Sequence, residues 1–318
     1  AGASLTVKPE TVIKIAQNSM FAVDGKLIAL GTEESPIFFT DLRDNTVGGE
    51  IPGAESPPEA GWWRSISIRN DGSAYFDWCR ISYGGRTDGG TIVKSGTGAL
   101  SVSNSVIANT SGDGLRIAAG YSSFEHFDNR YVSNTNGVRI GIGSSFVDQT
   151  TTFEGNAVDI YLDGGTVNGA VAWGSSSDYS MIVTGDVNIA TGALLSIHSG
   201  SVIKFRQNNR IIVYGVLEAT GKENLPIYFT DLRDDSVGGD ANRDGEEKVP
   251  ASGWWRSISI MTDGKADFEM CVIRYAGYGD KAGVLKNSSG HVAMSHTLVE
   301  HIAGDGFRVD NAAGGVMV

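Results

Sequence analysis

The acidic segment 234–250 contains the residues whose types and spacing point most directly to chemistry. It reads DDSVGGDANRDGEEKVP, with Asp240, Asn242 and Asp244 at positions 1, 3 and 5 of a run that Gly245 follows. This is the spacing of the first half of a calcium loop, in which alternate residues turn their oxygens to one point and glycine permits a sharp bend. The sequence therefore predicts one structural Ca²⁺ site in this loop.

The remaining ligands must come from elsewhere, because position 12 of the loop is Ala251 instead of glutamate. The candidates are nearby acidic residues and one backbone carbonyl: Asp234, Asp235, the carbonyl of Glu246 and the carboxylate of Glu247. The matching segment 48–61 reads GGEIPGAESPPEAG, which lacks the spacing and carries prolines, so we expect no calcium there. The alternative interpretation of 240–247 is a solvated acidic loop.

An internal duplication connects these two segments. The octapeptide GWWRSISI occurs at 61–68 and again at 253–260, and residues 11–49 align without gaps to 201–239. We expect one continuous domain over residues 1–318, built from copy 1 (1–200) and a truncated copy 2 (201–318). The truncation suggests that the chain is part of a larger protein.

A shorter repeat within the copies predicts the fold. GLRI (114–117), GVRI (137–140) and AVDI (157–160) recur at roughly 20–25 residues, each beside short alternating apolar runs. Asn109 and Asn134 follow such runs, where an asparagine tolerates a left-handed turn and can stack in successive coils as a ladder. We expect an all-β, single-stranded, right-handed parallel β-helix of about 12 coils. A leucine-rich repeat has the same period, but its leucine frame is missing.

The two cysteines, Cys79 and Cys271, stand at equivalent positions of the two copies. With about 4.8 Å between coils and roughly eight coils between the residues, they would lie on the order of 40 Å apart. A disulfide needs Cα atoms within about 7 Å. We therefore expect two separate buried thiols.

Several motifs in fixed order resemble one family. They are Val-Ile-Lys-(Ile/Phe), Pro-Ile-(Phe/Tyr)-Phe-Thr-Asp, Asp-(Asn/Asp)-(Thr/Ser)-Val-Gly-Gly and Gly-Trp-Trp-Arg-Ser-Ile. Their order is similar to that of parallel β-helix modules with pectate-lyase-like architecture in secreted and surface-displayed prokaryotic proteins. The resemblance implies that Trp63 and Trp255 belong to the core. Trp62 and Trp254 replace the usual aspartate, and they either cap the long loop or contact a glycan by stacking on sugar rings.

Composition narrows the function. The 318 residues carry a formal net charge of −12, which disfavours nucleic acid as a partner. No apolar run reaches membrane-spanning length. We expect an extracellular or cell-surface location, and a non-catalytic structural or adhesive module of a larger protein. Its partners would be neighbouring repeats or domains and a polysaccharide or cell-surface glycan.

The alternative function is a polysaccharide lyase or glycoside hydrolase that acts in a groove of the β-helix. It needs an acid, a base and a cation in a part of the chain that is not duplicated. The single-copy stretch 147–199 offers carboxylates such as Asp148 and Glu154 but no Lys or Arg, which argues against a lyase there. We assign no catalytic residue. The repeated TDLRD places Asp41 and Asp231 at strand ends, where we expect them to cap turns.

Overall fold

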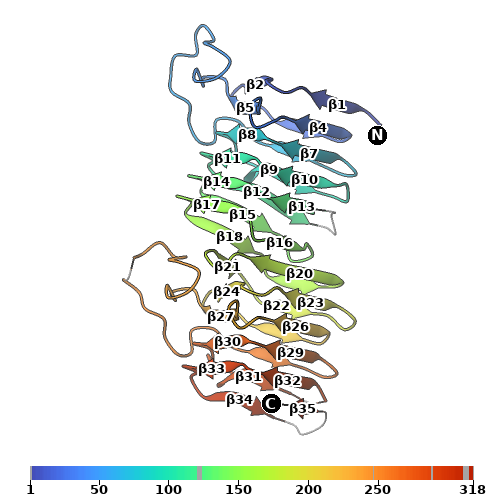
Figure 1. Cartoon of the computed structure of the whole chain (residues 1–318), viewed down its shortest axis with the longest axis vertical. Helices are drawn as coiled ribbons and strands as arrows, with labels where there is room; N and C mark the ends of the chain where they lie inside the picture. Colours follow the sequence, from blue (N-terminus) through green and yellow to red (C-terminus); the bar gives the residue numbers. More distant parts are fainter. Residues whose placement is uncertain (1, 120–123, 246, 288, 311–314, 318) are drawn as a thin grey trace. The chain divides into compact units, whose positions relative to one another are not determined.

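The computed structural model describes residues 2–119, 124–245, 247–287, 289–310 and 315–317. They form two compact units, one of residues 1–144 and 150–159 and the other of 145–149 and 160–318. Each unit is a parallel β-solenoid, with about 12 turns in all and 48% of residues in strands (Figure 1). The described residues contain no helix. The predicted fold class, an all-β parallel solenoid, is confirmed.

The strands are short, with two to seven residues each. Those of the first copy are β1 (Ser4–Val7), β2 (Val12–Ile15), β3 (Phe21–Val23), β4 (Lys26–Leu30), β5 (Ile37–Asp41), β6 (Ile66–Ile68), β7 (Ser73–Asp77), β8 (Cys79–Ser82), β9 (Gly90–Ser95), β10 (Leu100–Ser103), β11 (Val106–Ala108), β12 (Asp113–Ala119), β13 (Phe124–Phe127), β14 (Arg130–Val132), β15 (Asn136–Ile140), β16 (Phe146–Asp148), β17 (Thr152–Glu154), β18 (Val158–Leu162), β19 (Gly165–Val167), β20 (Ala170–Ser175), β21 (Ser180–Val183), β22 (Val187–Ile189) and β23 (Leu194–Ile197). Those of the second copy are β24 (Val202–Phe205), β25 (Ile211–Val213), β26 (Val216–Thr220), β27 (Ile227–Asp231), β28 (Ile258–Ile260), β29 (Lys265–Glu269), β30 (Cys271–Arg274), β31 (Ala282–Lys286), β32 (His291–Ser295), β33 (Leu298–Glu300), β34 (Asp305–Val309) and β35 (Val316–Met317).

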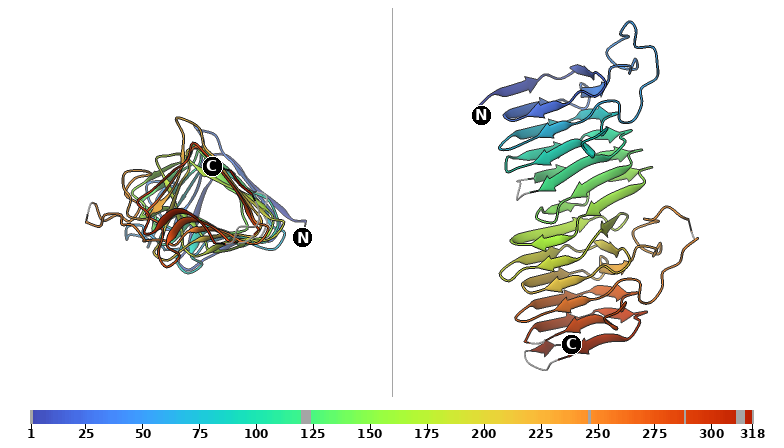
Figure 2. Two further views of the ribbon diagram at one scale, coloured as in Figure 1. Left: turned by 90° about the horizontal axis from the view of Figure 1, so that it is seen from below. Right: turned by 180° about the vertical axis from the view of Figure 1, so that it is seen from behind.

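In the first unit each coil contributes one strand to each of three sheets. Their orders are β1-β4-β7-β10-β13, β2-β5-β8-β11-β14-β17 and β3-β6-β9-β12-β15. The strands of successive coils pair in matching register: Val12 pairs with Phe38, and Phe38 pairs with Arg80. Equivalent residues of successive coils therefore stack above one another, and the coils of each unit enclose a three-sided interior when viewed along the stack (Figure 2).

The second unit repeats this plan. Its sheets include the orders β21-β24-β27-β30-β33, β16-β20-β23-β26-β29-β32-β35 and β19-β22-β25-β28-β31-β34. The strands β23–β34 match β1–β12 one for one in order and length, within one or two residues at the ends. The long loops fall at the same place in both copies, between β5 and β6 and between β27 and β28. Both loops project from their stacks (Figure 1).

Alternating side chains fill the interior, as the period of two predicts. In β29 the burial pattern places Ala266 and Phe268 inside and charged neighbours outside. Trp63 and Trp255 are fully buried, which confirms the core position that the family resemblance implied. Their indole Nε1 atoms donate to the carbonyls of Ser82 and Arg274, both at 2.8 Å.

Both cysteines are buried and free. Each thiol lies 3.3 Å from a backbone carbonyl of an adjacent coil, that of Ala29 for Cys79 and that of Ala219 for Cys271. Burial raises the pKa of each thiol to about 12, because the thiolate would lose its solvation. The two thiols therefore act as small apolar core groups, as predicted.

The asparagine ladder forms one residue away from the predicted pairing. Asn109 adopts the left-handed conformation with φ 54°, but its equivalent in the next coil is Ser133. Asn134 instead stacks with Asn156, whose Oδ1 accepts from the Asn134 amide Nδ2 at 3.0 Å. The left-handed position and the ladder position are neighbours in the turn, so the expected Asn109–Asn134 ladder was wrong.

Candidate metal centre

An aspartate at the end of β27 ties together the two ends of the second long loop. Asp231 is fully buried, and its Oδ1 accepts from the backbone N of Arg233 at 2.9 Å. Its Oδ2 accepts from Arg233 Nη2 at 2.6 Å and from the backbone N of Ala251 at 3.1 Å, close to where the chain returns. Asp41 makes the matching contacts in the first copy, with Arg43 and with the backbone N of Glu59. Both aspartates therefore cap turns, as predicted, and also close their loops.

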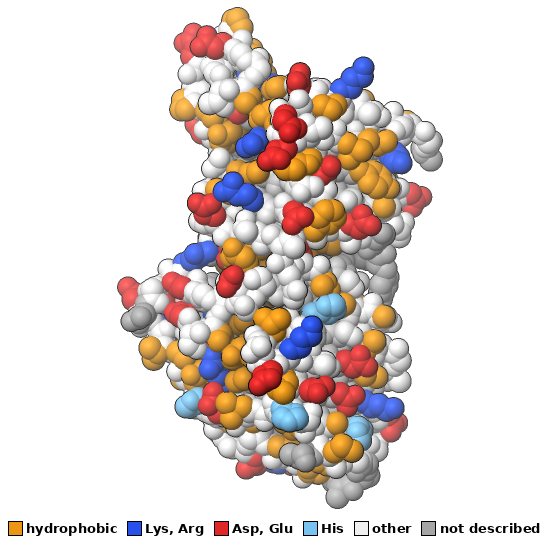
Figure 3. All heavy atoms as spheres, viewed as in Figure 1, with side chains coloured by type: hydrophobic (Ala, Val, Ile, Leu, Met, Phe, Trp, Pro, Cys, Tyr) orange, Lys and Arg blue, Asp and Glu red, His pale blue; other side chains and the backbone are white. Residues whose placement is uncertain are grey.

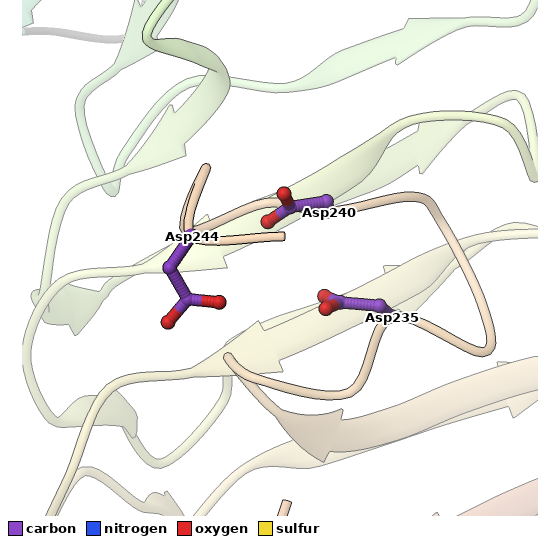
Figure 4. Close-up of side chains that lie close together, drawn as sticks. All are labelled: Asp235, Asp240 and Asp244. Atoms are coloured by element: carbon purple, nitrogen blue, oxygen red, sulfur yellow. The ribbon is translucent and has the colours of Figure 1, made fainter. Parts of the chain in front are cut away.

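Within the second loop, three carboxylates turn toward a common space (Figure 4). One oxygen each from Asp235, Asp240 and Asp244 lies within 4.8 Å of the others. Four side-chain oxygens of this loop are buried and lack a hydrogen-bond partner: Oδ1 of Asp235, Asp240, Asn242 and Asp244. Carboxylate and amide oxygens in this arrangement are the ligands that a hard cation such as Ca²⁺ takes.

Hydrogen bonds within the loop engage the second carboxylate oxygen of Asp240 and of Asp244. The backbone N of Gly245, at φ 68°, donates to Asp240 Oδ2 at 2.9 Å. Asn242 Nδ2 donates to Asp244 Oδ2 at 2.8 Å. These two bonds hold the turn 240–245 together and leave Oδ1 of Asp240 and of Asp244 buried without a hydrogen-bond partner.

Negative charge accumulates at this point. Burial raises the pKa of Asp235, and the neighbouring charges of Asp240 and Asp244 raise it further. Lys204 opposes this shift from the adjacent strand β24, and its Nζ donates to the carbonyl of Gly239 at 2.6 Å. Its own pKa falls to about 8 because of burial. One lysine against three carboxylates leaves an excess of negative charge, which a divalent cation would neutralise.

Lys204 was not among the residues singled out from the sequence. The sequence does contain an indication of its role: it is a lysine in the otherwise apolar VIKF run, and it occupies a fully buried strand position. A buried ammonium requires neighbouring acceptors. The lysine of VIKF therefore predicts carboxylate or carbonyl oxygens around its ammonium group.

Asp234 and Glu247, two other predicted ligands, are not part of this group. Asp234 is buried, and its Oδ2 lies 2.5 Å from both Arg274 Nη2 and Thr230 Oγ1. Its Oδ1 accepts from Ser236 Oγ at 2.7 Å, so both oxygens are engaged elsewhere. Glu247 is exposed, and Glu246 lies outside the described residues. The candidate set is therefore Asp235, Asp240, Asn242 and Asp244.

The two additional tryptophans lie beside the bases of the long loops. The guanidinium carbon of Arg43 is 3.5 Å from the ring centroid of Trp62, and that of Arg233 is 3.6 Å from the ring centroid of Trp254. Trp254 Nε1 also donates to the carbonyl of Phe205 at 3.0 Å. Each half-buried indole therefore already has an arginine on one face, which favours the loop-capping interpretation over stacking on a sugar.

Comparison of the chain with protein-family models, curated proteins and solved structures found no match. Acidic and basic side chains are interspersed on the visible face of the molecule, without a large patch of either sign (Figure 3). No helix suited to crossing a membrane occurs among the described residues.

Proposed function

We propose that this chain is a non-catalytic β-solenoid module of a larger secreted or cell-surface protein, in which one Ca²⁺ stabilises the long loop of the second copy. The observation that carries the proposal is the set of four buried Oδ1 atoms without hydrogen-bond partners at Asp235, Asp240, Asn242 and Asp244. Buried, unpaired carboxylate oxygens are costly, and a bound cation removes that cost.

The position of the ligands supports a structural role for the ion. All four belong to one loop, so a bound Ca²⁺ would connect Asp235 to the turn 240–244 and restrict the loop. Calcium takes about 6–8 oxygen ligands, and backbone carbonyls or water would supply the remainder. Extracellular modules bind calcium with Kd values of about 10⁻⁴–10⁻³ M, which suits the proposed location.

The internal duplication also supports a structural or adhesive role. The strands β1–β12 and β23–β34 correspond one for one, and both copies retain the loop-closing aspartate and the buried tryptophan. The features that are kept twice are those that build coils and attach loops. A stalk or surface-display module extends by adding such coils.

The test is thermal unfolding of the wild type with Ca²⁺, with Mg²⁺ and with a chelator, compared with Asp244→Asn and Asp240→Asn. Ca²⁺ should raise the Tm of the wild type and have little effect on either variant. At 100 times Kd the stabilisation is about 2.7 kcal/mol. Asp267→Asn is the matched control, because Asp267 is exposed on β29 and the change removes the same charge outside the loop.

Asp267→Asn should respond to Ca²⁺ as the wild type does. Calorimetric titration should give one ion per chain. If Ca²⁺ and Mg²⁺ shift the wild type equally, or if Asp244→Asn keeps the full response to Ca²⁺, the proposed loop site is wrong.

A further inference from the structure

The first copy contains a cleft beside its long loop. Among the described residues, the aspartate in its wall lacks the basic partner that the equivalent aspartate of the second copy has. The cleft has a volume of about 530 Å³ and is lined by residues that include Phe38, Thr40, Asp44, Ser82 and Tyr83. Asp44 lines it although only 6% of the residue is exposed. A carboxylate at the wall of an open cleft is an anchor for a cationic group.

Asp44 has hydroxyl partners but no basic partner. Thr40 Oγ1 donates to its Oδ2 at 2.7 Å, and Thr46 Oγ1 and backbone N donate to its Oδ1 at 2.6 and 3.1 Å. No Lys, Arg or His in the described ranges forms an ion pair with it. Each carboxylate oxygen accepts more than one hydrogen bond, so Oδ2 retains capacity for a further donor.

In the second copy, the equivalent aspartate and hydroxyl groups bind a guanidinium. Asp234 corresponds to Asp44, and it has the same hydroxyl contacts through Thr230 and Ser236. Here the guanidinium of Arg274 completes the site, with Nη2 2.5 Å from Asp234 Oδ2 and 2.7 Å from Ser236 Oγ.

Two aromatic rings flank this guanidinium. Its carbon lies 5.4 Å from the ring centroid of Tyr228 and 5.7 Å from that of Tyr275. Arg274 is largely enclosed, with 13% of its side chain exposed. The first copy keeps equivalents of both rings, Phe38 and Tyr83.

The first copy lacks the guanidinium and its second acidic contact, and it has exposed Arg80 where the second copy has Val272. Ser82 stands where the second copy has Arg274. In the next coil, Ala108 is paired with Ser82, whereas Glu300 is paired with Arg274 and lies 3.7 Å from its Nη1. The second copy thus pairs the aspartate of this place with an arginine of the chain itself, whereas the first copy leaves the equivalent aspartate, Asp44, without a basic partner in the described residues.

We propose that the cleft of the first copy binds the guanidinium group of an arginine side chain from a partner polypeptide. A guanidinium presents donors in a planar fork and stacks on aromatic rings, so it fits Asp44 together with Phe38 and Tyr83. Exposed Arg80 and Glu33 lie at the rim. The charge of Arg80 favours an arginine that is flanked by an acidic residue over a run of basic residues. This site lies in the first unit and is independent of the proposed calcium loop.

The test uses Nα-acetyl-arginine-N-methylamide as the probe, titrated into the full chain and followed by NMR. The wild type should bind one probe molecule. Ser82→Arg should fill the cleft and weaken binding at least about tenfold, and Asp44→Asn should do the same. Arg274→Ser should open the second pocket and raise the stoichiometry to two. The lysine analogue of the probe should bind more weakly, because its ammonium lacks the planar fork.

Ser82→Arg should fold, because the second copy already accommodates arginine at this place, and circular dichroism checks that it does. Unchanged binding by Ser82→Arg would overturn the proposal. So would the absence of any interaction between folded wild type and the arginine probe, or equal binding of the lysine analogue.

Discussion

The guanidinium of Arg43 covers the indole of Trp62, with 3.5 Å between its Cζ atom and the ring centroid. The same guanidinium pairs with Asp41, with 2.8 Å between Nη2 and Oδ2. Asp41 is fully buried, and its Oδ2 also accepts a hydrogen bond from the backbone N of Glu59 at the far end of the loop. One arginine therefore neutralises the aspartate that closes the loop and fixes the tryptophan beside it.

Arg43→Met should lower the free energy of unfolding by about 3–5 kcal/mol, because it leaves the buried charge of Asp41 without its partner. Urea denaturation measures the loss. Arg80→Met is the control: Arg80 is exposed on β8, and its replacement should change stability by less than about 0.5 kcal/mol. Adding Asp41→Asn to Arg43→Met should recover part of the loss. Equal stability of the two single variants would contradict this role for Arg43.

Asn134→Ala should destabilise the first unit by about 1–3 kcal/mol, the usual cost of a buried polar group left unpaired. Its Oδ1 accepts from the backbone N of Thr110 at 3.2 Å, and its Nδ2 donates to the carbonyl of Ile107 at 3.0 Å. Asn109→Gly is the comparison, because glycine adopts the φ of 54° readily and should cost little. Denaturant midpoints measure both changes, and a larger loss from Asn109→Gly would show that the ladder is of minor importance.

Both thiols should resist alkylation by iodoacetamide at pH 9 in the native protein and react rapidly in urea. Burial raises the pKa of Cys79 and Cys271 to about 12, whereas the pKa of a thiol in the unfolded chain is about 8.5. Their contribution to stability is thus complete below the unfolded pKa and is lost as the pH rises toward the folded one. The double alanine variant should lose less stability than the wild type between about pH 8 and pH 10. Rapid native alkylation would show that the thiols are accessible.

Ca²⁺ should slow tryptic cleavage after Arg243 and Lys248, because a protease requires the loop to open locally. Both residues are exposed within the second long loop. Lys281 is exposed in the same unit but outside this loop, so cleavage after it should be independent of Ca²⁺. Mass spectrometry of the fragments over time distinguishes the sites. Equal protection at all three would indicate global stabilisation instead of a restrained loop.

The solenoid was predictable from the sequence because its strands depend on local periodicity. In β29, KADFE alternates in sequence and in burial, and the interval between equivalent runs sets the length of a coil. The calcium-type spacing of Asp240, Asn242 and Asp244 was visible for the same reason, since neighbours in one tight turn share a direction. These inferences needed only residues that are close along the chain.

Contacts between coils were decided by the tertiary structure. The sequence offered Asp234 and Asp235 equally as ligands, but Arg274 from the next strand of the sheet pairs with Asp234 and leaves Asp235 to face the loop. The asparagine ladder likewise depended on whether position 109 or 110 stacks on position 134. Periodicity along the chain determined which side chains face inward. The partner that each one meets depends on the stacking register between distant residues, which local sequence does not specify.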